Sequence, residues 1–506
     1  MSHDTIVVGS GAAGTWAAWA LRGTRTLVVD VGHRPPEGRL EGNLYDLRRA
    51  RPLYDLTLGT RYESLHSLEN PELTPKLKAP LFRHVTERPE GAPGIRSETF
   101  QAVASYAQGG LANAWGAQIY RFLKDDLAGF PVAEEDLAPH YDTLTREIGI
   151  SGAQDDLERF HGPATGLLPP LELTGLGRRV LERYGESFRR EGVFMGRPRL
   201  AVRNPDYGNL EFFQPRLPSV YTPAYTLDSM VDKGEIEYAP GHRVVSFRET
   251  EDGVEVRSTT QTFRAKRLVL ALGALNTARL VLASEGDHES RLPVLENPCS
   301  FVPMVMLSRI GMPLEKRSFF AQLNLFYSGD LWKEPVVGMI YGVEGLLRSD
   351  LLFQFPFAAR GCLAAARLML PAMAVLQVFY PEDPDPSNTL RLGAEGELVI
   401  EYRPRAPGVV ERHLLRVLKK AGLRGRPAHL RAGLPGASIH YAGSLPMRAK
   451  PVRRYETDPT GLLFGKRRVY VADAATFPRL PAKNLTFTIM ANAIRIGEAV
   501  RRELGR

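Results

Sequence analysis

The first thirty residues constrain the fold more than any other stretch of the chain. Thr5–Val8 is a run of β-forming residues that leads into glycines at positions 9, 11 and 14. An alanine-rich apolar segment, Trp16–Leu21, follows, and a second apolar run, Thr26–Val29, ends at Asp30. Strand, glycine turn, helix, strand and acid in this order predict a parallel βαβ unit that binds a dinucleotide. The alternative, a glycine-rich turn without a ligand, is disfavoured because every part of the unit is present.

Each residue of this turn has an expected role. Gly9 permits the tight turn, Gly11 lets the backbone approach a pyrophosphate, and Gly14 lets the helix pack close to the strand. The N–H groups at the helix N-terminus, with Ala12 and Ala13, are expected to face the phosphates. Asp30 can accept hydrogen bonds from the adenosine ribose, and an acid there disfavours a 2′-phosphate. The predicted ligand is therefore FAD or NAD rather than NADP.

A second strand–glycine–helix unit lies far along the chain. Leu268–Leu272 reads as a buried strand, followed by a turn at Gly273 and a helix from Asn276. Two alternating segments before it, Val244–Arg248 and Gly253–Ser258, predict a hairpin with a Glu-Asp-Gly turn, and Val245 is expected beside the nucleotide. Parallel sheets are assembled from such units, so the nucleotide domain is expected to be discontinuous.

The segment 286–455 departs from this α/β pattern and predicts an antiparallel sheet in a second domain. The predicted fold class is α/β (α+β), with a Rossmann-like nucleotide-binding domain from residues 1–150, 216–285 and 456–506. A substrate-binding domain is predicted from residues 151–215 and 286–455. The expected strands of its sheet are Val302–Ile310, Phe319–Tyr327, Val336–Tyr341, Gln377–Phe379 and Leu398–Tyr402.

Three helices are expected outside these units, at residues 131–148, 176–191 and 222–233. Thr222 is the expected N-cap of the last one, with Pro223 in its first turn. Residues 33–100 are weakly periodic and predict an extended excursion with short helices. His66 and His84, which lie in this excursion, are expected to be structural or exposed.

Length and composition set the remaining limits. A chain of 506 residues is too long for one core, which predicts about two to four domains. Cys299 and Cys362 form no metal pattern and are expected to be plain thiols in a reducing compartment. No signal peptide precedes the first strand, so a cytoplasmic location is expected, with peripheral membrane contact left open.

Basic residues cluster at Arg403–Arg431, Arg448–Arg454 and Lys466–Arg468, and the net charge is +8. A solvated basic surface is the favoured interpretation. An anionic membrane surface or an anionic substrate is the alternative. Nucleic acid is disfavoured because no basic-aromatic platform accompanies the charge.

The segment Leu351–Tyr380 is long and apolar but is interrupted by Arg360 and Arg367. Its longest charge-free run, Leu368–Tyr380, has 13 residues, whereas a transmembrane helix needs about 20. A buried helix followed by a strand is favoured over a membrane span. A hydrophobic lid or a monotopic membrane contact stays open as the alternative.

Ala107–Gly116 contains the adjacent glycines Gly109 and Gly110, followed by Asn113 and Ala114. Two neighbouring glycines allow the backbone to press against a flat or charged ligand, and Asn113 can both donate and accept hydrogen bonds. Taken by itself, the segment is more simply interpreted as a loop without a ligand.

The C-terminal region contains the residues expected to carry the chemistry. His440 stands in a neutral, glycine-flanked segment, and an apolar strand ends at Asp473 and Ala474. Asn484, Leu485 and Thr486 then lead into an amphipathic helix, Thr486–Leu504. Taken singly, His440 could be structural and Asn484 or Thr486 a plain helix cap. A strand ending in Ala-Asp before a helix N-terminus, however, suits the pyrimidine end of a flavin, because the positive helix end would face N1 and C2=O. This combination favours FAD over NAD.

At this point the sequence resembles the glucose–methanol–choline (GMC) oxidoreductases. The resemblance covers the whole chain in layout and is specific in the motifs already described. The family pattern His-x-x-Gly-Thr-x-x-Met is matched by His440–Met447, and the pattern Val-Ala-Asp-Ala-Ser-x-x-Pro by Val471–Pro478. Three departures are visible: Leu485 stands in place of a proline, Ala475 in place of a serine and Ser444 in place of a threonine.

The resemblance implies an FAD-dependent enzyme that oxidises a C–OH group to a carbonyl. His440 would accept the hydroxyl proton while hydride passes to flavin N5, and Asn484 would hydrogen-bond the substrate oxygen. Because the segment around Gly109 holds no histidine to which some members link FAD, non-covalent FAD is expected.

A sugar or sugar-derived alcohol is the favoured substrate, because Asn484 and Asn113 offer neutral hydrogen-bonding groups. A hydrophobic or lipid-linked alcohol at a membrane and a non-catalytic flavoprotein are the alternatives. The sequence identifies neither the electron acceptor nor the oligomeric state.

Overall fold

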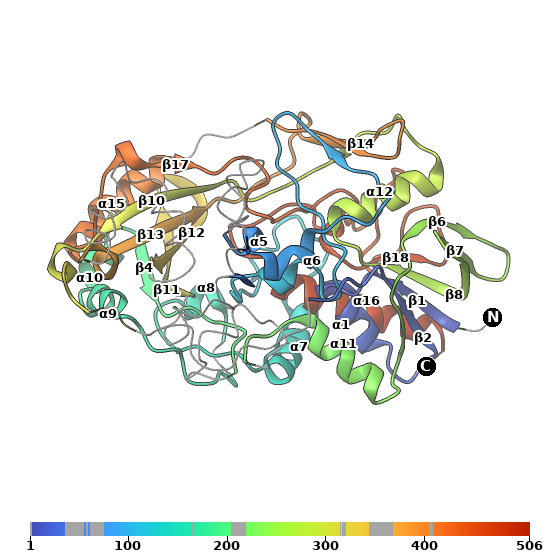
Figure 1. Cartoon of the computed structure of the whole chain (residues 1–506), viewed down its shortest axis with the longest axis horizontal. Helices are drawn as coiled ribbons and strands as arrows, with labels where there is room; N and C mark the ends of the chain where they lie inside the picture. Colours follow the sequence, from blue (N-terminus) through green and yellow to red (C-terminus); the bar gives the residue numbers. More distant parts are fainter. Residues whose placement is uncertain are drawn as a thin grey trace.

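The structure is a computed structural model, and it describes residues 3–35, 55–56, 59–60, 75–163, 165–203, 219–313, 315, 320–343, 368–403 and 408–505. Figure 1 shows two lobes: one carries both labelled termini, and the other carries the antiparallel strands β10–β13. His66, Cys362 and the Leu351–Arg367 part of the apolar segment lie outside the described residues.

The first lobe is built on a seven-stranded sheet whose central strands run parallel in the order β5-β2-β1-β8, with β18 also paired to β8. β8 is long enough to pair with β7 through its first half and with β18 through its second half. The strands of this sheet are β1 (His3–Val8), β2 (Thr26–Val29), β5 (Glu237–Ala239), β6 (Val244–Glu249), β7 (Val254–Ser258), β8 (Thr262–Leu270) and β18 (Val469–Val471). The predicted βαβ unit, hairpin and second crossover are therefore confirmed.

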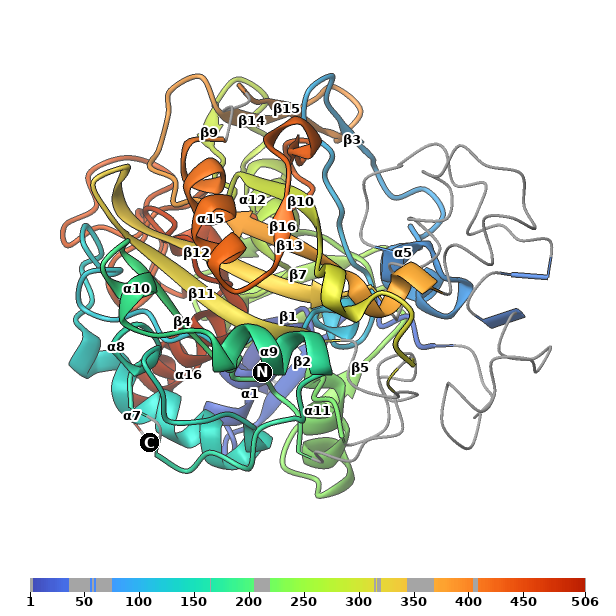
Figure 2. The same ribbon diagram turned by 90° about the vertical axis from the view of Figure 1, so that its left-hand side faces the viewer.

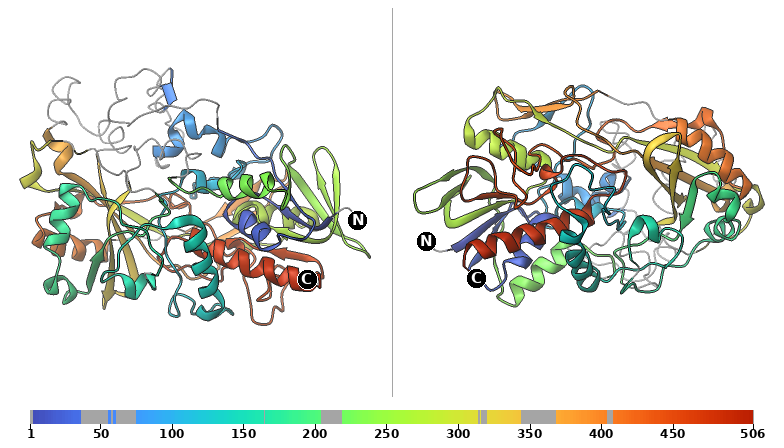
Figure 3. Two further views of the ribbon diagram at one scale, coloured as in Figure 1. Left: turned by 90° about the horizontal axis from the view of Figure 1, so that it is seen from below. Right: turned by 180° about the vertical axis from the view of Figure 1, so that it is seen from behind.

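Both faces of this sheet are covered, as expected for parallel strands buried on each side. One face packs on helices α1 (Ala12–Ala20) and α16 (Thr486–Glu503), which meet so closely that a side chain on Gly497 would lie 2.7 Å from the carbonyl oxygen of Ala17. Figure 3 shows α16, in red, lying beneath the blue N-terminal strands. The other face packs on α12 (Ala274–Glu285) and on a small sheet. That small sheet contains β3 (Ile95–Arg96), β9 (Leu292–Pro293), β14 (Thr389–Leu392) and β15 (Leu398–Glu401).

The second lobe confirms the predicted antiparallel sheet. Its strands are β4 (Val193–Gly196), β10 (Cys299–Val305), β11 (Ala321–Gly329), β12 (Trp332–Gly342), β13 (Met373–Phe379), β16 (Arg424–Gly425) and β17 (Arg431–Ala432). The predicted strand Leu398–Tyr402 belongs instead to the small sheet, as β15. Helices α9 (Gly175–Glu182) and α15 (Val409–Lys420) cover the outer face of the large antiparallel sheet, and Figure 2 looks onto α9 with β11, β12 and β4 behind it. The opposite face of this sheet is turned toward the first lobe.

The remaining described helices are short or peripheral. They are α5 (Pro75–Lys78), α6 (Arg83–Thr86), α7 (Glu134–Leu144), α8 (Glu158–His161), α10 (Glu186–Arg189) and α11 (Pro223–Asp232). Single turns occur at η1 (Pro80–Phe82), η2 (Gly110–Ala114), η3 (Thr145–Gly149), η4 (Leu307–Arg309), η5 (Leu370–Ala372), η6 (Pro427–His429) and η7 (Ala474–Thr476). The predicted continuous helix 176–191 is wrong: Arg183, Tyr184 and Gly185 interrupt it, and Gly185 has an extended backbone (φ 172°) that a helix cannot contain.

The apolar run Leu368–Tyr380 forms η5 and the central strand β13, whose Leu376 and Val378 are fully buried in the second lobe. The strand half of the favoured interpretation is therefore confirmed. No helix among the described residues is long and apolar enough to cross a membrane.

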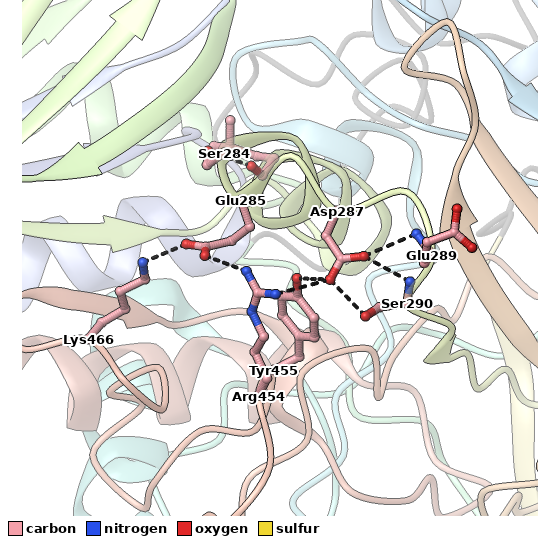
Figure 4. Close-up of polar contacts among 9 residues, drawn as sticks. Ser284, Glu285, Asp287, Glu289, Ser290, Arg454, Tyr455 and Lys466 are labelled. Atoms are coloured by element: carbon pink, nitrogen blue, oxygen red, sulfur yellow. Dashed lines mark hydrogen bonds and ion pairs between the residues drawn. The ribbon is translucent and has the colours of Figure 1, made fainter.

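Part of the predicted basic surface is engaged in ion pairs that fasten the segment before β18 to the end of α12. Arg454 contacts both Glu285 (2.6 Å) and Asp287 (3.3 Å), and Lys466 contacts Glu285 (Figure 4). The Asp287 carboxylate also accepts from the Tyr455 hydroxyl at 2.6 Å. Burial raises the pKa of Asp287, but the hydrogen bonds from Tyr455 and Ser290 outweigh it and hold that pKa well below its usual range. These pairs position the connection that delivers β18 and the residues after it.

Candidate active site

A cavity of about 890 Å³ runs between the two lobes. Its first part lies at the carboxyl edge of the parallel sheet, where β1, β2, β8 and β18 end and where ligands of open α/β sheets bind. The cavity wall contains most of the predicted cofactor residues: Gly9, Gly11, Ala12, Ala13, Asp30, Gly110, Ala114, Val245, Gly273, Asp473, Ala474, Asn484, Leu485 and Thr486. His440 lies on the same wall. Parallel strands from distant parts of the chain thus bring the two ends of the sequence pattern together.

Three helices begin at this cavity, and none has a side chain bonded to its first N–H groups. The N-caps are Gly11 for α1, Gly273 for α12 and Leu485 for α16. The alternative interpretation of Asn484 or Thr486 as a plain helix cap is therefore not supported. At α12 the N–H of Gly273 donates to Asp473, so it is the N-termini of α1 and α16 that give the cavity free backbone donors and partial positive charge. These suit a group with a pyrophosphate at one end and an electron-accepting ring at the other.

We call the part of the cavity at the carboxyl edge of the parallel sheet the cradle. Two glycine turns, at Gly9 and Gly110, pack closely along it. A side chain on Gly9 would lie 2.5 Å from the carbonyl oxygen of Ala271, and one on Gly110 would lie 3.1 Å from the Cα atom of Gly11. Gly9 and Gly110 both have positive φ angles, 99° and 62°, which L residues rarely adopt. Both requirements select glycine here.

Gly14, Gly109 and Asn113 support the cradle from behind and do not line the cavity. A side chain on Gly14 would overlap the carbonyl oxygen of Gly9. Asn113 donates to the carbonyl oxygens of Gln108 (2.8 Å) and Gly110 (2.9 Å) and accepts from the hydroxyl of Thr222 (2.8 Å). Thr222 is the N-cap residue of α11 and Pro223 follows in the first turn, as predicted, but the Thr222 hydroxyl braces this loop and makes no capping hydrogen bond.

Two buried acids close the ends of the cradle. Asp30 accepts from the backbone N–H of Ser10 at 3.0 Å, and burial raises the pKa of this carboxyl to about 6. Asp473 accepts from the N–H of Gly273 at 2.9 Å and from the hydroxyl of Thr277 at 2.5 Å, and burial likewise raises its pKa to about 6. Asp473 therefore joins the β18 end to the β8–α12 turn across 200 positions of sequence.

His440 stands where the cradle opens toward the antiparallel sheet. Its Nε2 lies 3.2 Å from the side-chain nitrogen of Asn484, and its Nδ1 lies 3.0 Å from Oδ1 of Asn297. Phe379 stacks on the ring at a centroid distance of 5.1 Å. Burial lowers the pKa of His440 to about 4, so the imidazole is neutral across the physiological range. Asn484 Oδ1 is buried without a hydrogen-bond partner among the described residues, which leaves an acceptor for a bound group.

Beyond His440 the cavity is walled by one face of the antiparallel sheet. Phe301 on β10, Gln377 on β13 and Met339 on β12 are successive cross-strand partners, so their side chains share that face. The sequence predicted these strands but not which face would be turned to a ligand, because the alternation alone does not distinguish the two.

Known proteins resemble this chain in its C-terminal sequence and in its fold. A family model described as GMC oxidoreductase matches residues 413–493, which include His440, Asp473 and Asn484. The chain therefore carries a GMC oxidoreductase C-terminal domain. It is 23% identical to paromamine 6′-oxidase from Streptomyces fradiae over 99% of this chain and 92% of that protein. The fold resembles that of pyridoxine 4-oxidase from Mesorbium loti, with a TM-score of 0.62, 14% identity and 99% of both chains covered.

GMC oxidoreductases bind FAD, and the residues present here fit that cofactor. The glycine cradle, the uncapped N-termini of α1 and α16 and the acid at Asp30 supply the donors, close approach and ribose acceptor that FAD needs. Asn297, Gln377 and Phe379 were not predicted as site residues. A lone Asn before a proline and alternating strand residues carry no signal that points to a catalytic site.

Proposed function

We propose that this protein uses FAD to oxidise a C–OH group to a carbonyl, with a sugar or sugar-derived alcohol as substrate. The observation that supports it best is the meeting of His440 Nε2 and the Asn484 amide at 3.2 Å on the cavity wall. The bound flavin supplies the acceptor for the hydride. The chain supplies a base and a donor for the substrate hydroxyl.

His440 accepts the hydroxyl proton at Nε2, because this is the ring nitrogen beside Asn484 on the cavity wall. A general base must be unprotonated before the reaction, and the lowered pKa of His440 keeps it so. The substrate hydroxyl takes over the Nε2 lone pair that the Asn484 N–H now contacts, and the Asn484 amide then donates to the substrate oxygen, so the hydroxyl is oriented and deprotonated at one point. Removal of such a base costs about 10²–10⁴-fold in rate.

Non-covalent FAD is part of the proposal. The histidines on the cavity wall among the described residues are His242 and His440. His242 lies beside Arg243 and Val245, in the part of the wall near Asp30, and His440 is needed as the base. The loop around Gly110 offers no nucleophile for a covalent link.

The substrate class follows from the wall beyond His440. Phe301, Met339 and Phe379 provide an apolar surface, and Gln377 places one neutral amide in the middle of it. A sugar ring can lie with its C–H face on such a surface while a hydroxyl bonds to the amide. The acids on the described cavity wall are Asp30 and Asp473, both in the cradle. An ammonium group near His440 would therefore find no carboxylate, which favours a neutral alcohol over an amine such as paromamine.

Anaerobic flavin reduction tests this proposal directly. The holoenzyme is mixed with neutral sugars, amino sugars and aromatic alcohols without oxygen, and bleaching of the flavin absorbance is followed. Bleaching by neutral sugars that is slowed about 10²-fold or more in His440→Ala at equal FAD content supports the proposal. If none of the alcohols bleaches the flavin, the protein is better explained as a non-catalytic flavoprotein.

One observation favours a second candidate, a hydrophobic alcohol at a membrane surface. Leu307, Ile310, Met312 and Leu368 are 42–55% exposed, and the N–H of Gly311 bonds to the carbonyl of Leu368, so they lie together. Arg179, which bonds to Ser308, adds positive charge beside them. Co-sedimentation with phosphatidylglycerol vesicles, but not with phosphatidylcholine vesicles, would support it. No binding at low salt to either vesicle would exclude it.

A further inference from the structure

Asn297 is a fully buried residue that lies between β9 and β10 and bonds to the proposed base. Its side-chain nitrogen donates to two backbone carbonyls, those of Tyr380 at 2.9 Å and Pro481 at 2.8 Å. Carbonyl oxygens only accept hydrogen bonds. The amide can therefore adopt one orientation, because the flipped form would place Oδ1 against both of them.

This orientation decides the state of His440. Oδ1 of Asn297 is an acceptor and lies 3.0 Å from Nδ1 of the ring, so Nδ1 must carry the hydrogen. A neutral imidazole carries only one hydrogen, and Nε2 is then a bare acceptor. The N–H of Asn484 at 3.2 Å is consistent with that, since an amide nitrogen donates to a lone pair.

The neighbouring residue in the chain holds the backbone of the same histidine. Glu296 accepts from the N–H of Gly436 (2.6 Å) and from the hydroxyl of Ser438 (2.9 Å), and Ser438 in turn accepts from the N–H of His440 (3.3 Å). Ile439, directly before His440, has φ of 59°, which is unfavourable for a β-branched residue. The loop therefore needs the external support that Glu296 gives.

We propose that Asn297 is a positioning residue that fixes His440 as the Nδ1–H tautomer and so presents a bare Nε2 to the substrate hydroxyl. The proposal rests on the function proposed above for His440, but it concerns the ring itself and can be tested without turnover. Asn297 does not line the cavity, so it acts through the residues that it holds, and His440 is the one of these whose ring it contacts.

The test uses holoenzyme labelled with ¹⁵N-histidine, in which the nitrogen resonances distinguish the two tautomers. His440 is assigned by its loss in His440→Ala. The wild type is expected to show a protonated Nδ1 and an unprotonated Nε2. Asn297→Leu, which has nearly the same size but cannot accept, is expected to show a mixture of tautomers. Its kcat is expected to fall about 10–10²-fold with little change in KM, because misorientation of a catalytic group of this kind costs up to about 10².

Asn388→Ala is the matched control. Asn388 is also buried and bonds to Glu382 and to the N–H of Arg403, but it makes no contact with His440. It should retain the wild-type tautomer and kcat.

If Asn297→Leu folds poorly, Asn297→Asp is the second variant. Its carboxyl is expected to be protonated, so that the O–H donates to one of the two carbonyls while the other oxygen accepts from Nδ1, and it should retain the Nδ1–H tautomer. The proposal is overturned if the wild type carries its proton on Nε2, or if Asn297→Leu keeps a single Nδ1–H form and full kcat. If the tautomer is as stated but His440→Ala remains fully active, the proposed function fails while the assignment of Asn297 stands.

Discussion

The buried carboxyl of Glu296 should make the stability of the protein depend on pH, and replacing it should remove that dependence. Glu296 is 3% exposed, and burial raises its pKa from 4.5 to about 8. The hydrogen bonds from Ser438 and Gly436 reduce this rise, and the nearby carboxylate of Glu382 adds to it. The folded protein therefore holds a proton on Glu296 that the unfolded chain releases above pH 4.5.

The sign and size follow from this difference in proton binding. A raised folded-state pKa gives stability that is fully present below pH 4.5 and is lost as the pH rises toward 8. Each pH unit in that window removes about 1.4 kcal/mol, or about 5 kcal/mol in all. Glu296→Gln keeps an acceptor for Gly436 and Ser438 but cannot ionise. Its stability relative to the wild type should therefore increase by about 1.4 kcal/mol per pH unit between pH 5 and 8.

The measurement is urea unfolding of both holoenzymes at several pH values, followed by tryptophan fluorescence and compared at matched FAD concentration because bound cofactor adds stability. Glu182→Gln, an exposed acid on α9, is the control and should follow the wild-type curve. Parallel curves for Glu296→Gln and the wild type between pH 5 and 8 would refute the reasoning, since they would show that Glu296 ionises in the folded state as it does in water.

Three further outcomes are expected. Activity should fall as the pH drops toward about 4, because burial lowers the pKa of His440 and protonation removes the base; a kcat/KM profile that is flat from pH 7 to 4 would contradict this. Gly110→Val should lower FAD content measured by absorbance, because Gly110 has a φ of 62° and a side chain there would lie 3.1 Å from the Cα atom of Gly11. Gly234→Val, at a residue with a similar φ of 67° but open space around it, should keep FAD, and equal FAD in both would argue against the cradle. Gln377→Leu should raise KM for a neutral sugar about 10-fold, as expected for one lost hydrogen bond, while an aromatic alcohol is affected less; unchanged KM values would place the sugar elsewhere.

The parts of the fold that could be predicted are those whose signal lies within a short stretch of sequence. The β1–α1–β2 unit, the β6–β7 hairpin and the β8–α12 crossover each carry a complete signal in fewer than forty residues. Their assembly also follows, since parallel strands place their carboxyl ends on one edge. His440 and Asn484 were predicted from resemblance and lie together on the cavity wall. Their catalytic roles remain predictions.

The features that the sequence did not predict are those that depend on contacts between distant parts of the chain. Thr222 occupies the N-cap position of α11, but its hydroxyl donates to the side-chain oxygen of Asn113 and makes no capping hydrogen bond. Helix 176–191 is interrupted at Arg183, Tyr184 and Gly185, where the backbone becomes extended, and periodicity does not register such an interruption. Asn297 had no local signature, because its importance arises from carbonyls of Tyr380 and Pro481 that are distant in sequence. Single polar residues held by distant backbone groups are the class that sequence patterns miss.

The packing of α16 on α1 also determines when the first lobe can finish folding during synthesis. Leu268–Leu270 pair with Val469–Val471, and Gly497 packs onto Ala17, so the first βαβ unit is synthesised long before the partners that cover it. Until they emerge from the ribosome, β8 keeps an unpaired edge and α1 an uncovered apolar face, both of which favour aggregation. The flavin half of the cradle does not yet exist during that interval. Full enclosure of the cofactor therefore has to await the synthesis of β18 and α16.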